Sequence, residues 1–597
     1  MVGYIGRGDE QELLQAITAE PQANDPRLRY AYLLEGRGDP LGEFVRLQCA
    51  LDAGPPAAAT SEIEARVAQL LATHESEWLA PISKFVRAHT FRRGFLETLA
   101  LFDYPCDPAS LARLAEFPLL AALTTLSLDG KCGPTGASAL AASLLLGRLA
   151  YLGLSRNEIG DEGARLLSGS SYLASLTQLD LSVNMITDGG AIALASSVDM
   201  RNLVRLNLGG NQVGGAGLVA LVTSRHLPAL RSLTTSYGRP PFLEWAPRED
   251  CCAGDASSWS EERSLACISC AGAPVGDKAI AEIAASPGLR SISRLDLYGA
   301  GIGAEGARTL GASTCLGNLQ LLDLGAAERY GRNNIGDVGA EALLGSRELL
   351  DLRHLLLARN ELGERAAAAL AAASLPQLQK LDLSYNSLGD AGATALSSSL
   401  PQARLLVLDL SFNGIGDPGA TSLAAAPLLS TLEALDLGGN NIGPDGAEKI
   451  AASPNLARLR GLRLGRAADD KDVQNNRIGD RGAAALAGAV WLANVELLDL
   501  STNGISDAGV RALAASRYLR NVTDLDLSNN DLSNAAVDAL VASPYLGALR
   551  RLGLSNSLPN LTRESYYDWD GSLSHSSFSS DEAEAVHRRF AREVSVY

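Results

Sequence analysis

The chain of 597 residues has no long apolar run and few cysteines. No stretch approaches the roughly eighteen uninterrupted apolar residues that a membrane-spanning helix needs. The first residues lack the basic and then apolar order of a secretory signal, so the expected location is the cytoplasm. Eight cysteines in a chain of this length do not suggest a disulfide framework. We therefore expect neither a membrane protein nor a scaffold held by disulfides.

Basic residues are also fewer than acidic ones. The chain has 51 lysines and arginines against 68 aspartates and glutamates, which gives a net charge of -17. Nucleic acids and anionic membranes bind to concentrated basic faces, so neither is expected as a partner. An acidic surface favours a basic protein partner, but it also keeps a large protein soluble. The charge alone does not separate these two roles.

Signatures of catalysis are missing from the sequence. The six histidines are scattered, at positions 74, 89, 226, 354, 575 and 587. We find no nucleophile elbow, no His-Glu-x-x-His motif and no phosphate-binding Gly-x-x-x-x-Gly-Lys segment. No pair of a general acid and a general base stands out either. We therefore expect no enzymatic activity and no cofactor.

What the sequence does contain is a repeated hexad, Leu-x-x-Leu-x-Leu. Its first copy is Leu96, Leu99 and Leu101, and thirteen of the sixteen steps between copies are 26 or 27 residues long. A fixed period of this length, with Asn three residues after the Leu-x-Leu core, is the signature of a leucine-rich repeat solenoid. The central residue of the hexad, Ile in one copy and Leu in the others, stands at 99, 126, 152, 179, 206, 233, 268, 295, 322, 355, 381, 408, 435, 462, 498, 525 and 552.

Each repeat reads as a short strand, a turn and a helix. The two leucines of Leu-x-Leu should point into the core, while the residue between them points out of the sheet. A recurring Asn can satisfy backbone groups in the turn, and a recurring Asp is placed to cap the helices that follow. The Asn positions are 157, 184, 211, 334, 360, 386, 413, 440, 476, 503 and 530, and the Asp positions are 161, 188, 277, 337, 390, 417, 480 and 507.

The expected fold is therefore an α/β solenoid of about seventeen repeats, a horseshoe with a parallel sheet on the concave side and helices on the convex side. This pattern resembles the ribonuclease-inhibitor type of leucine-rich repeat over residues 96–557. That family includes ribonuclease inhibitor, the sensor ends of NOD-like receptors and the Ran GTPase-activating protein. The resemblance implies binding of a macromolecule across the concave face, which is an inference about the class only.

Both ends of the chain lie outside the repeat. In residues 1–95 we expect four helices, the last beginning at a capping box formed by Ser61 and Glu64. Residues 27–48 and 91–97 resemble a small bacterial domain known as a repeat companion, which implies a bacterial origin. Residues 558–597 should cap the other end of the array, because an open solenoid end exposes its core.

Three repeats carry insertions, after Leu233, Leu322 and Leu462. They comprise residues 237–262, 325–333 and 465–475. Insertions confined to one side of a solenoid often mark a binding edge, and drift in a surface loop is the other explanation. The sequence leaves both open.

Two other motifs have ordinary explanations. Residues 301–306 satisfy the Gly-x-Gly-x-x-Gly dinucleotide pattern, but the consensus of the repeat accounts for each residue. Cys251, Cys252, Cys267 and Cys270 have a spacing that suggests zinc. A regular strand would aim Cys267 and Cys270 in opposite directions, so we expect no structural metal.

The strongest candidate site is on the concave face. Between the two core leucines stands Asp at 180, 296, 323, 382, 409, 436, 499 and 526. Because neighbouring strands lie about 4.8 Å apart, Asp382, Asp409 and Asp436 should form a column of like charge. Mutual repulsion should raise the pKa of some of these carboxyls and favour a cationic partner. Such an Asp is also ordinary consensus in repeats of this kind, so the column has two explanations.

A row of large side chains should lie beside the Asp column. Arg359, Tyr385 and Phe412 occupy the variable position just before Asn in consecutive repeats. Exposed Tyr, Phe and Arg are residue types that dominate protein interfaces. We therefore expect Tyr385 and Phe412 to act as apolar anchors for a partner.

The sequence favours a non-enzymatic scaffold that binds a basic protein through this face. The alternative is a regulator of a small GTPase, by resemblance to the Ran GTPase-activating family. The activity of that family depends on an Arg and Asn region, and both Arg156-Asn157 and Arg359-Asn360 stand at consensus positions of the repeat. An enzyme acting on an oligonucleotide or a metabolite is a third, weaker hypothesis. Neither the oligomeric state nor the identity of the partner is indicated.

Overall fold

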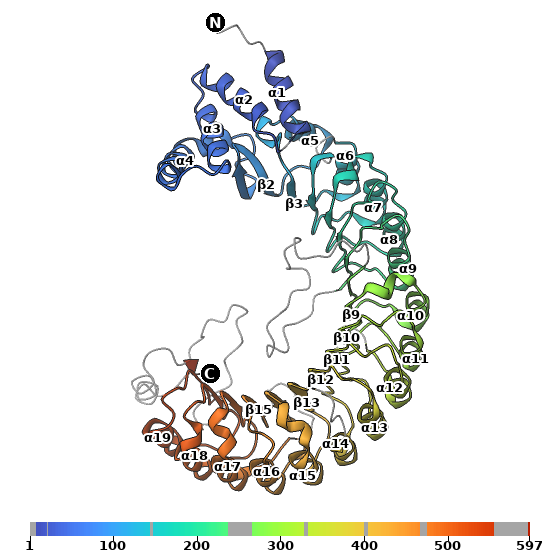
Figure 1. The fold of residues 1–597 in the computed structure, drawn as a ribbon, viewed down its shortest axis with the longest axis vertical. Coiled ribbons are helices and arrows are strands. Elements are labelled where there is room, and N and C mark those ends of the chain that lie inside the picture. Colours follow the sequence, from blue (N-terminus) through green and yellow to red (C-terminus); the bar gives the residue numbers. More distant parts are fainter. Residues whose placement is uncertain are drawn as a thin grey trace. The chain divides into compact units, whose positions relative to one another are not determined.

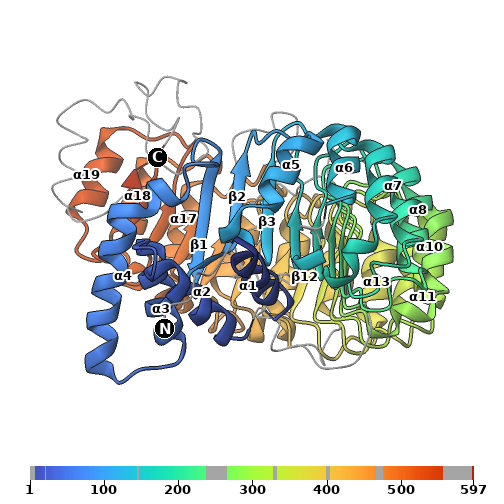
Figure 2. The same cartoon turned by 90° about the horizontal axis from the view of Figure 1, so that it is seen from above.

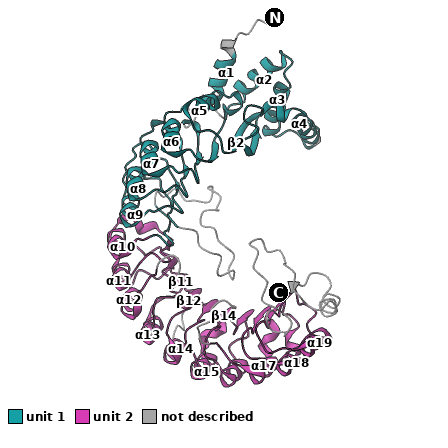
Figure 3. Ribbon diagram, turned by 180° about the vertical axis from the view of Figure 1, so that it is seen from behind, with its two compact units in different colours: residues 1–240, 250–273 teal, residues 241–249, 274–597 magenta. Residues whose placement is uncertain are grey.

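The computed structural model describes residues 7–20, 22–143, 147–236, 265–326, 332–398, 404–465, 475–554 and 595–596. These residues form two compact units (Figure 3). Unit 1 contains the described residues up to Ala273, and unit 2 contains those from Pro274 onward. Most of the predicted insertions and of the predicted C-terminal cap lie outside the described residues.

Unit 1 begins with a group of helices followed by a β-hairpin and then repeats of strand and helix (Figures 1 and 2). Its elements are α1 (Arg7–Ala19), α2 (Asp25–Glu35), α3 (Pro40–Asp52), α4 (Ala57–Trp78), β1 (Val86–Arg92), β2 (Phe95–Phe102), α5 (Pro108–Ala115), β3 (Thr125–Asp129), α6 (Gly133–Ala141), β4 (Tyr151–Gly153), α7 (Gly160–Ser168), β5 (Gln178–Asp180), α8 (Asp188–Ala195), β6 (Arg205–Asn207), α9 (Gly215–Val222), β7 (Ser232–Thr234) and β8 (Cys267–Ser269).

Unit 2 consists of repeats of strand and helix alone, with a last short strand near the C-terminus. Its elements are α10 (Gly276–Ala284), β9 (Arg294–Asp296), α11 (Ala304–Ala312), β10 (Leu321–Asp323), α12 (Gly336–Leu344), β11 (His354–Leu356), α13 (Glu364–Ala372), β12 (Lys380–Asp382), α14 (Gly389–Ser397), β13 (Val407–Asp409), α15 (Asp417–Ala425), β14 (Ala434–Asp436), α16 (Pro444–Ala451), β15 (Gly461–Arg463), α17 (Gly479–Ala487), β16 (Leu497–Asp499), α18 (Asp507–Ala514), β17 (Asp524–Asp526), α19 (Asn534–Ala542), β18 (Arg551–Gly553) and β19 (Ser595–Val596).

The strands of each unit pair in chain order. In unit 1, β1 is antiparallel to β2, and β2 to β8 are parallel. In unit 2, β9 to β18 are parallel, and β19 adds to β18. From β2 to β8 and from β9 to β18, the central residues of the hexads are direct partners, and none is more than 3% exposed. The predicted repeats and their register are therefore confirmed.

Helices cover one face of each sheet (Figure 1). The opposite face carries the side chain that stands between the two core leucines of each strand, and we call it the open face. The leucines themselves fill the space between strand and helix, so that Leu383 and Leu410, for example, are fully buried. The thin core repeats once per strand, as a solenoid requires.

A ladder of buried asparagines joins successive repeats. Asn184 accepts hydrogen bonds from the backbone N–H groups of Asn157, at 2.9 Å, and Ile159, at 3.2 Å, in the repeat before it. Its amide N–H groups donate to backbone carbonyls in the turns. One predicted member was wrong: Asn333 and not Asn334 occupies the ladder, because its amide donates to Leu297 of the preceding repeat.

The recurring aspartates cap the helix of the next repeat instead of their own. Asp480, in the first turn of α17, accepts hydrogen bonds from Ser506 N, at 2.8 Å, and Gly509 N, at 2.9 Å, at the start of α18. The far end of α18 is also held by a neighbour, because Ser543 Oγ donates to the carbonyl of Ala514, at 2.6 Å. Each repeat therefore depends on both neighbours to satisfy its helix ends.

The N-terminal helices pack on the hairpin of β1 and β2. Phe44 of α3 contacts Phe91 of β1 edge to face, with ring centres 5.3 Å apart. The predicted capping box was wrong, since α4 begins at Ala57 and so includes Ser61 and Glu64. Strand β1 was not predicted, and it extends the sheet of the repeats by one antiparallel strand. The division of the chain at residues 95 and 557 stays a prediction.

The structure contains a disulfide that was not expected, between Cys106 and Cys132. It joins the segment before α5 to the residue before α6, with Cα atoms 5.0 Å apart. The two cysteines are 26 residues apart, which is one step of the repeat. The bond therefore ties two consecutive repeats of unit 1 together.

Candidate functional site

The predicted Asp column lies on the open face of unit 2. Strands β12, β13 and β14 pair so that Asp382 is the direct partner of Asp409, and Asp409 is the direct partner of Asp436. The column exists because each carboxylate stands at the same position of its hexad, one residue after the buried central leucine. Shared register then brings three like charges onto adjacent strands.

The sequence had led us to expect these carboxylates to project freely from the sheet. In the structure they do not. Asp382 is 2% exposed and Asp409 is 6% exposed. Asp409 Oδ1 accepts hydrogen bonds from both the backbone N–H and the hydroxyl of Ser411, at 2.9 and 2.6 Å, and Asp382 bonds Ser384 in the same way. Each carboxylate is thus drawn back over the turn that follows its strand. This local hydrogen bond gives the consensus Asp a structural role in every such repeat.

The column raises pKa values, in the direction that the sequence predicts. Burial is the largest cause of the raised pKa of Asp409, followed by the charges of Asp436 and Asp382. The pKa of Asp436 rises to about 6, mainly through burial, although the nearby Arg463 acts in the opposite direction. Repulsion is therefore real but secondary to removal from water.

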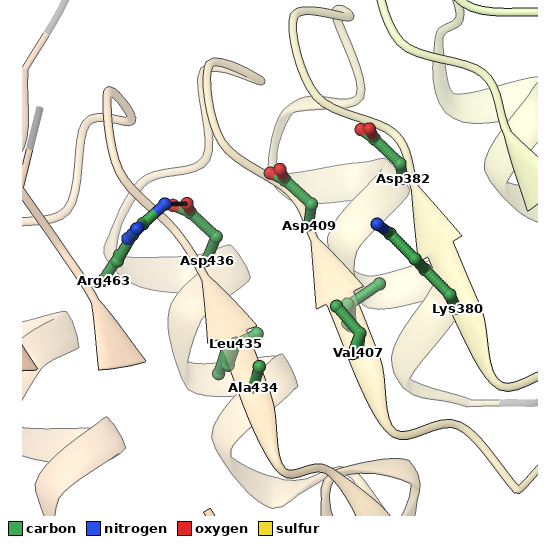
Figure 4. A pocket seen from close by; sticks show the side chains of 9 residues that line it. Lys380, Asp382, Val407, Asp409, Ala434, Leu435, Asp436 and Arg463 are labelled. Atoms are coloured by element: carbon green, nitrogen blue, oxygen red, sulfur yellow. Dashed lines mark ion pairs between the residues drawn. The ribbon is translucent and has the colours of Figure 1, made fainter. Parts of the chain in front are cut away.

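A hollow of about 360 Å³, partly open to solvent, lies over the column (Figure 4). Its floor is formed by Val407 of β13 and Ala434 of β14. Lys380 of β12 stands at one end, and Arg463 of β15 stands at the other, with its Nη1 3.8 Å from Asp436 Oδ2. The hollow therefore combines an apolar floor, three carboxylates and two flanking cations. The sequence predicted the carboxylates but neither cation.

The predicted large side chains stack on one another. The rings of Tyr385 and Phe412 are nearly parallel, with centres 4.0 Å apart and an angle of 10° between their planes. The guanidinium carbon of Arg359 lies 3.6 Å from the centre of the Tyr385 ring. All three side chains are half-buried rather than exposed, because each covers part of the next. We call Arg359, Tyr385 and Phe412 the stack.

The backbone explains why the stack forms. Arg359, Tyr385 and Phe412 have φ angles of 57°, 55° and 55°, in the left-handed region, so their side chains leave consecutive turns in the same direction. The next residue of this series is Gly439, where an added Cβ would lie 2.5 Å from the ring of Phe412. The glycine thus makes room for the last ring. A partner would meet the edges of these rings, since their faces are covered.

Comparison with known proteins agrees with the architecture. The pattern of the family described as Leucine Rich repeat matches residues 149–168, 172–195, 199–222, 331–344, 375–397, 405–424, 429–451, 472–487, 492–514 and 518–541. These segments are leucine-rich repeats. All three residues of the Asp column, Asp382, Asp409 and Asp436, fall within them.

Other comparisons add little to the assignment of leucine-rich repeats. An internalin (inlF) from Listeria monocytogenes strain 4b F2365 has a solved structure that is 20% identical, with a TM-score of 0.29. The match covers 65% of this chain and 76% of that one. Such a likeness carries no argument about function. Among curated proteins, none is similar enough to match.

The other sequence motifs belong to the leucine-rich repeats. Asn157 and Asn360, from the two Arg-Asn pairs, are fully buried members of the Asn ladder. In the glycine motif, Ile302 N donates to Asn333 of the ladder and Gly303 N donates to the cap residue Asp277. These four residues therefore serve the contacts of the repeat itself.

The cysteine motif lies partly outside the described residues, which contain Cys267 and Cys270 but not Cys251 or Cys252. Both described cysteines of this motif are buried. Within the described ranges, no group of three or more His, Cys, Asp or Glu side chains is arranged to hold a metal ion. In the same part of the chain, no helix has the length and apolar character needed to cross a membrane.

Proposed function

We propose that the chain is a non-enzymatic scaffold that binds a basic protein through the open face of unit 2. Proteins built from leucine-rich repeats generally act as protein-binding scaffolds. One observation carries the more specific proposal: three carboxylates on adjacent strands lie next to the stack of Arg359, Tyr385 and Phe412. Aromatic side chains beside charge are typical of interface hot spots.

The stack suits this role because it is already ordered. Tyr385 and Phe412 are held by each other, by Arg359 and by the space above Gly439. Because these rings are already held in place, binding of a partner against them costs little side-chain entropy. The carboxylates contribute in another way, since an acidic surface steers a basic partner toward the face.

Two variants test the proposal on a partner captured by the full chain from a lysate of the source cell. Tyr385→Ala with Phe412→Ala should weaken binding by about 2 kcal/mol or more, which is the scale of hot-spot truncation. The matched control is Tyr298→Ala, an aromatic residue of unit 2 that follows β9 and is not part of the stack. Unchanged affinity in the double variant, with melting temperatures also unchanged, would move the site away from this face.

The carboxylates are tested separately by changing Asp382, Asp409 and Asp436 to Asn. Asn keeps a carbonyl oxygen that can accept the hydrogen bonds of the turn, so the fold should persist. The association rate should fall and its dependence on salt should flatten, because the charges act mainly by steering. A rate that keeps the salt dependence of the wild type would argue against a basic partner.

We also propose a bacterial origin for the chain and the ribonuclease-inhibitor type for its repeats. The first rests on the resemblance of residues 27–48 and 91–97 to the repeat-companion domain, and the second on the α-helix of eight or nine residues that follows most strands of the repeats. No observation favours the alternative of a GTPase regulator, because Asn157 and Asn360 form hydrogen bonds within the Asn ladder.

A further inference from the structure

The charges around the hollow form an ordered series along the strands. Asp382, Asp409 and Asp436 are followed on β15 by Arg463, which pairs in register with Asp436 on one side and Asp499 on the other. Lys380 lines the other end of the same hollow (Figure 4). Negative charge is therefore concentrated at the middle of the hollow, and positive charge stands at both ends.

Asp409 is the residue at that middle. Both hydrogen bonds that it accepts end on Oδ1, which leaves Oδ2 without a donor among the described residues. It is 6% exposed, and its register partners on both sides are carboxylates. Asp436, by contrast, has the guanidinium of Arg463 nearby. Of the three carboxylates, Asp409 would therefore be stabilised most by a cation that a partner supplies.

The dimensions of the hollow limit what can fill it. Its 360 Å³ includes open solvent, and the enclosed space is about 20 Å³, which is room for about one water molecule, so the hollow is a shallow depression in the open face. From β12 to β15 there are three strand spacings of about 4.8 Å each. One long side chain can lie across such a depression, with its aliphatic part on Val407 and Ala434 and its charge over Asp409.

On the basis of the proposed function, we propose that the hollow receives one lysine or arginine side chain of the partner, seated over Asp409. Lys380 and Arg463 exclude a second cation next to it, because that cation would approach one of them as a like charge. The partner therefore presents an isolated basic residue among neutral or acidic neighbours. A polybasic segment does not fit, although the net charge of -17 would attract it from a distance.

A synthetic peptide array tests this with the full chain. The probes are 12-residue peptides with Lys, Arg or Met at the centre, with varied apolar flanks, and with either neutral residues or two further lysines beside the centre. The wild-type chain should retain the peptides with a single Lys or Arg at least tenfold more strongly than those with Met. It should also prefer them to the peptides with three lysines.

Three variants make the assignment specific. Asp409→Asn should remove the preference for a central cation, whereas Asp526→Asn, at the equivalent position of β17 and outside the hollow, should keep it. Arg463→Gln should admit the peptides with three lysines. The inference is overturned if the wild-type chain prefers these peptides at every salt concentration, if it retains none, or if Asp526→Asn acts like Asp409→Asn.

The proposed function fails by a different result. It fails if the captured partner ignores the loss of both Tyr385 and Phe412. If the partner is lost in that double variant while the array shows no preference for a single cation, only the present inference is wrong.

Discussion

The open faces of the two units differ in charge although their scaffolds are alike. In unit 1, the position between the core residues is Asp in one of seven strands, namely Asp180 in β5. In unit 2 it is Asp in seven of ten strands, with Arg463 and two uncharged residues in the others. The same buried leucines, Asn ladder and helix caps are present in both. The chemistry of the face therefore varies independently of the interactions that hold the repeats together.

Loss of the disulfide should produce the largest difference in stability between the two units. Cys106 and Cys132 lie in unit 1, and cross-links of this kind typically stabilise by about 2–4 kcal/mol. Cys106→Ser should lower the stability of the first repeats by that amount and leave β12 to β18 unaffected, as hydrogen exchange would reveal.

Because cytosolic thiols are usually reduced, a count of thiols in native protein from the source cell also tests the expected cytoplasmic location. Two thiols at these positions would mean that the bond is not used there.

Removal of an Asn from the ladder should affect both units alike. Asn184 in unit 1 and Asn440 in unit 2 each accept hydrogen bonds from two backbone N–H groups of the preceding repeat, at 2.9 and 3.2 Å for Asn184 and 2.9 and 3.0 Å for Asn440. Changing either to Ala leaves those groups buried without partners and should cost about 2–3 kcal/mol in the free energy of unfolding. Denaturant titration measures both. A large difference between the two variants would show that the scaffolds are less alike than their hydrogen bonds suggest.

A smaller effect, this time a gain in stability, should follow when a carboxylate of the Asp column in unit 2 is replaced by a neutral side chain. The pKa of Asp409 is raised in the folded chain, so folding is favoured when this carboxyl is protonated, and stability falls as the pH rises above about 4. Asp436, with a pKa of about 6, marks the upper part of the same window. Asp409→Asn should therefore raise the free energy of unfolding at pH 8 and have little effect at pH 4, as denaturant titration at the two pH values would show.

The matched substitution in unit 1 is Asp180→Asn. Asp180 also accepts a hydrogen bond from the residue two places on, Ser182, but its register partners are the uncharged Gly153 and Asn207. Without like charges beside it, the change should alter stability by less than about 0.5 kcal/mol at either pH. Equal effects of the two substitutions would mean that the column of carboxylates adds nothing.

Much of the fold could be predicted from the sequence because one signal determines it. A buried leucine at a fixed period sets the strand, its register and the direction of its neighbours, so the Asp column followed from the hexad alone. The burial of Asp382 and Asp409 did not follow, because it depends on where the N–H groups of the turn point. The stack required knowledge of the left-handed backbone at Tyr385 and Phe412.

Some of the differences from the sequence-based expectations involve bonds between residues far apart in the chain. Asp480 accepts a hydrogen bond from Ser506, the N-cap residue of α18, which lies 26 residues later and is brought near only by the stacking of repeats. The disulfide did have a signal in the sequence, since Cys106 and Cys132 are separated by one step of the repeat. In the pair Asn333 and Asn334, counting back two residues from Ile335 would have selected the correct one.

The caps shared between repeats give the array a direction. Asp417 of α15 accepts hydrogen bonds from Gly443 N and Gly446 N at the start of α16, while Ser453 after α16 donates to Ala424 of α15. A cut between these two helices would leave bare N–H groups and a serine donor on one fragment, and a carboxylate and a bare carbonyl on the other. The two ends are complementary to each other and neither is complementary to itself. Fragments of unit 2 should therefore reassemble in their native order and should not pair with copies of themselves.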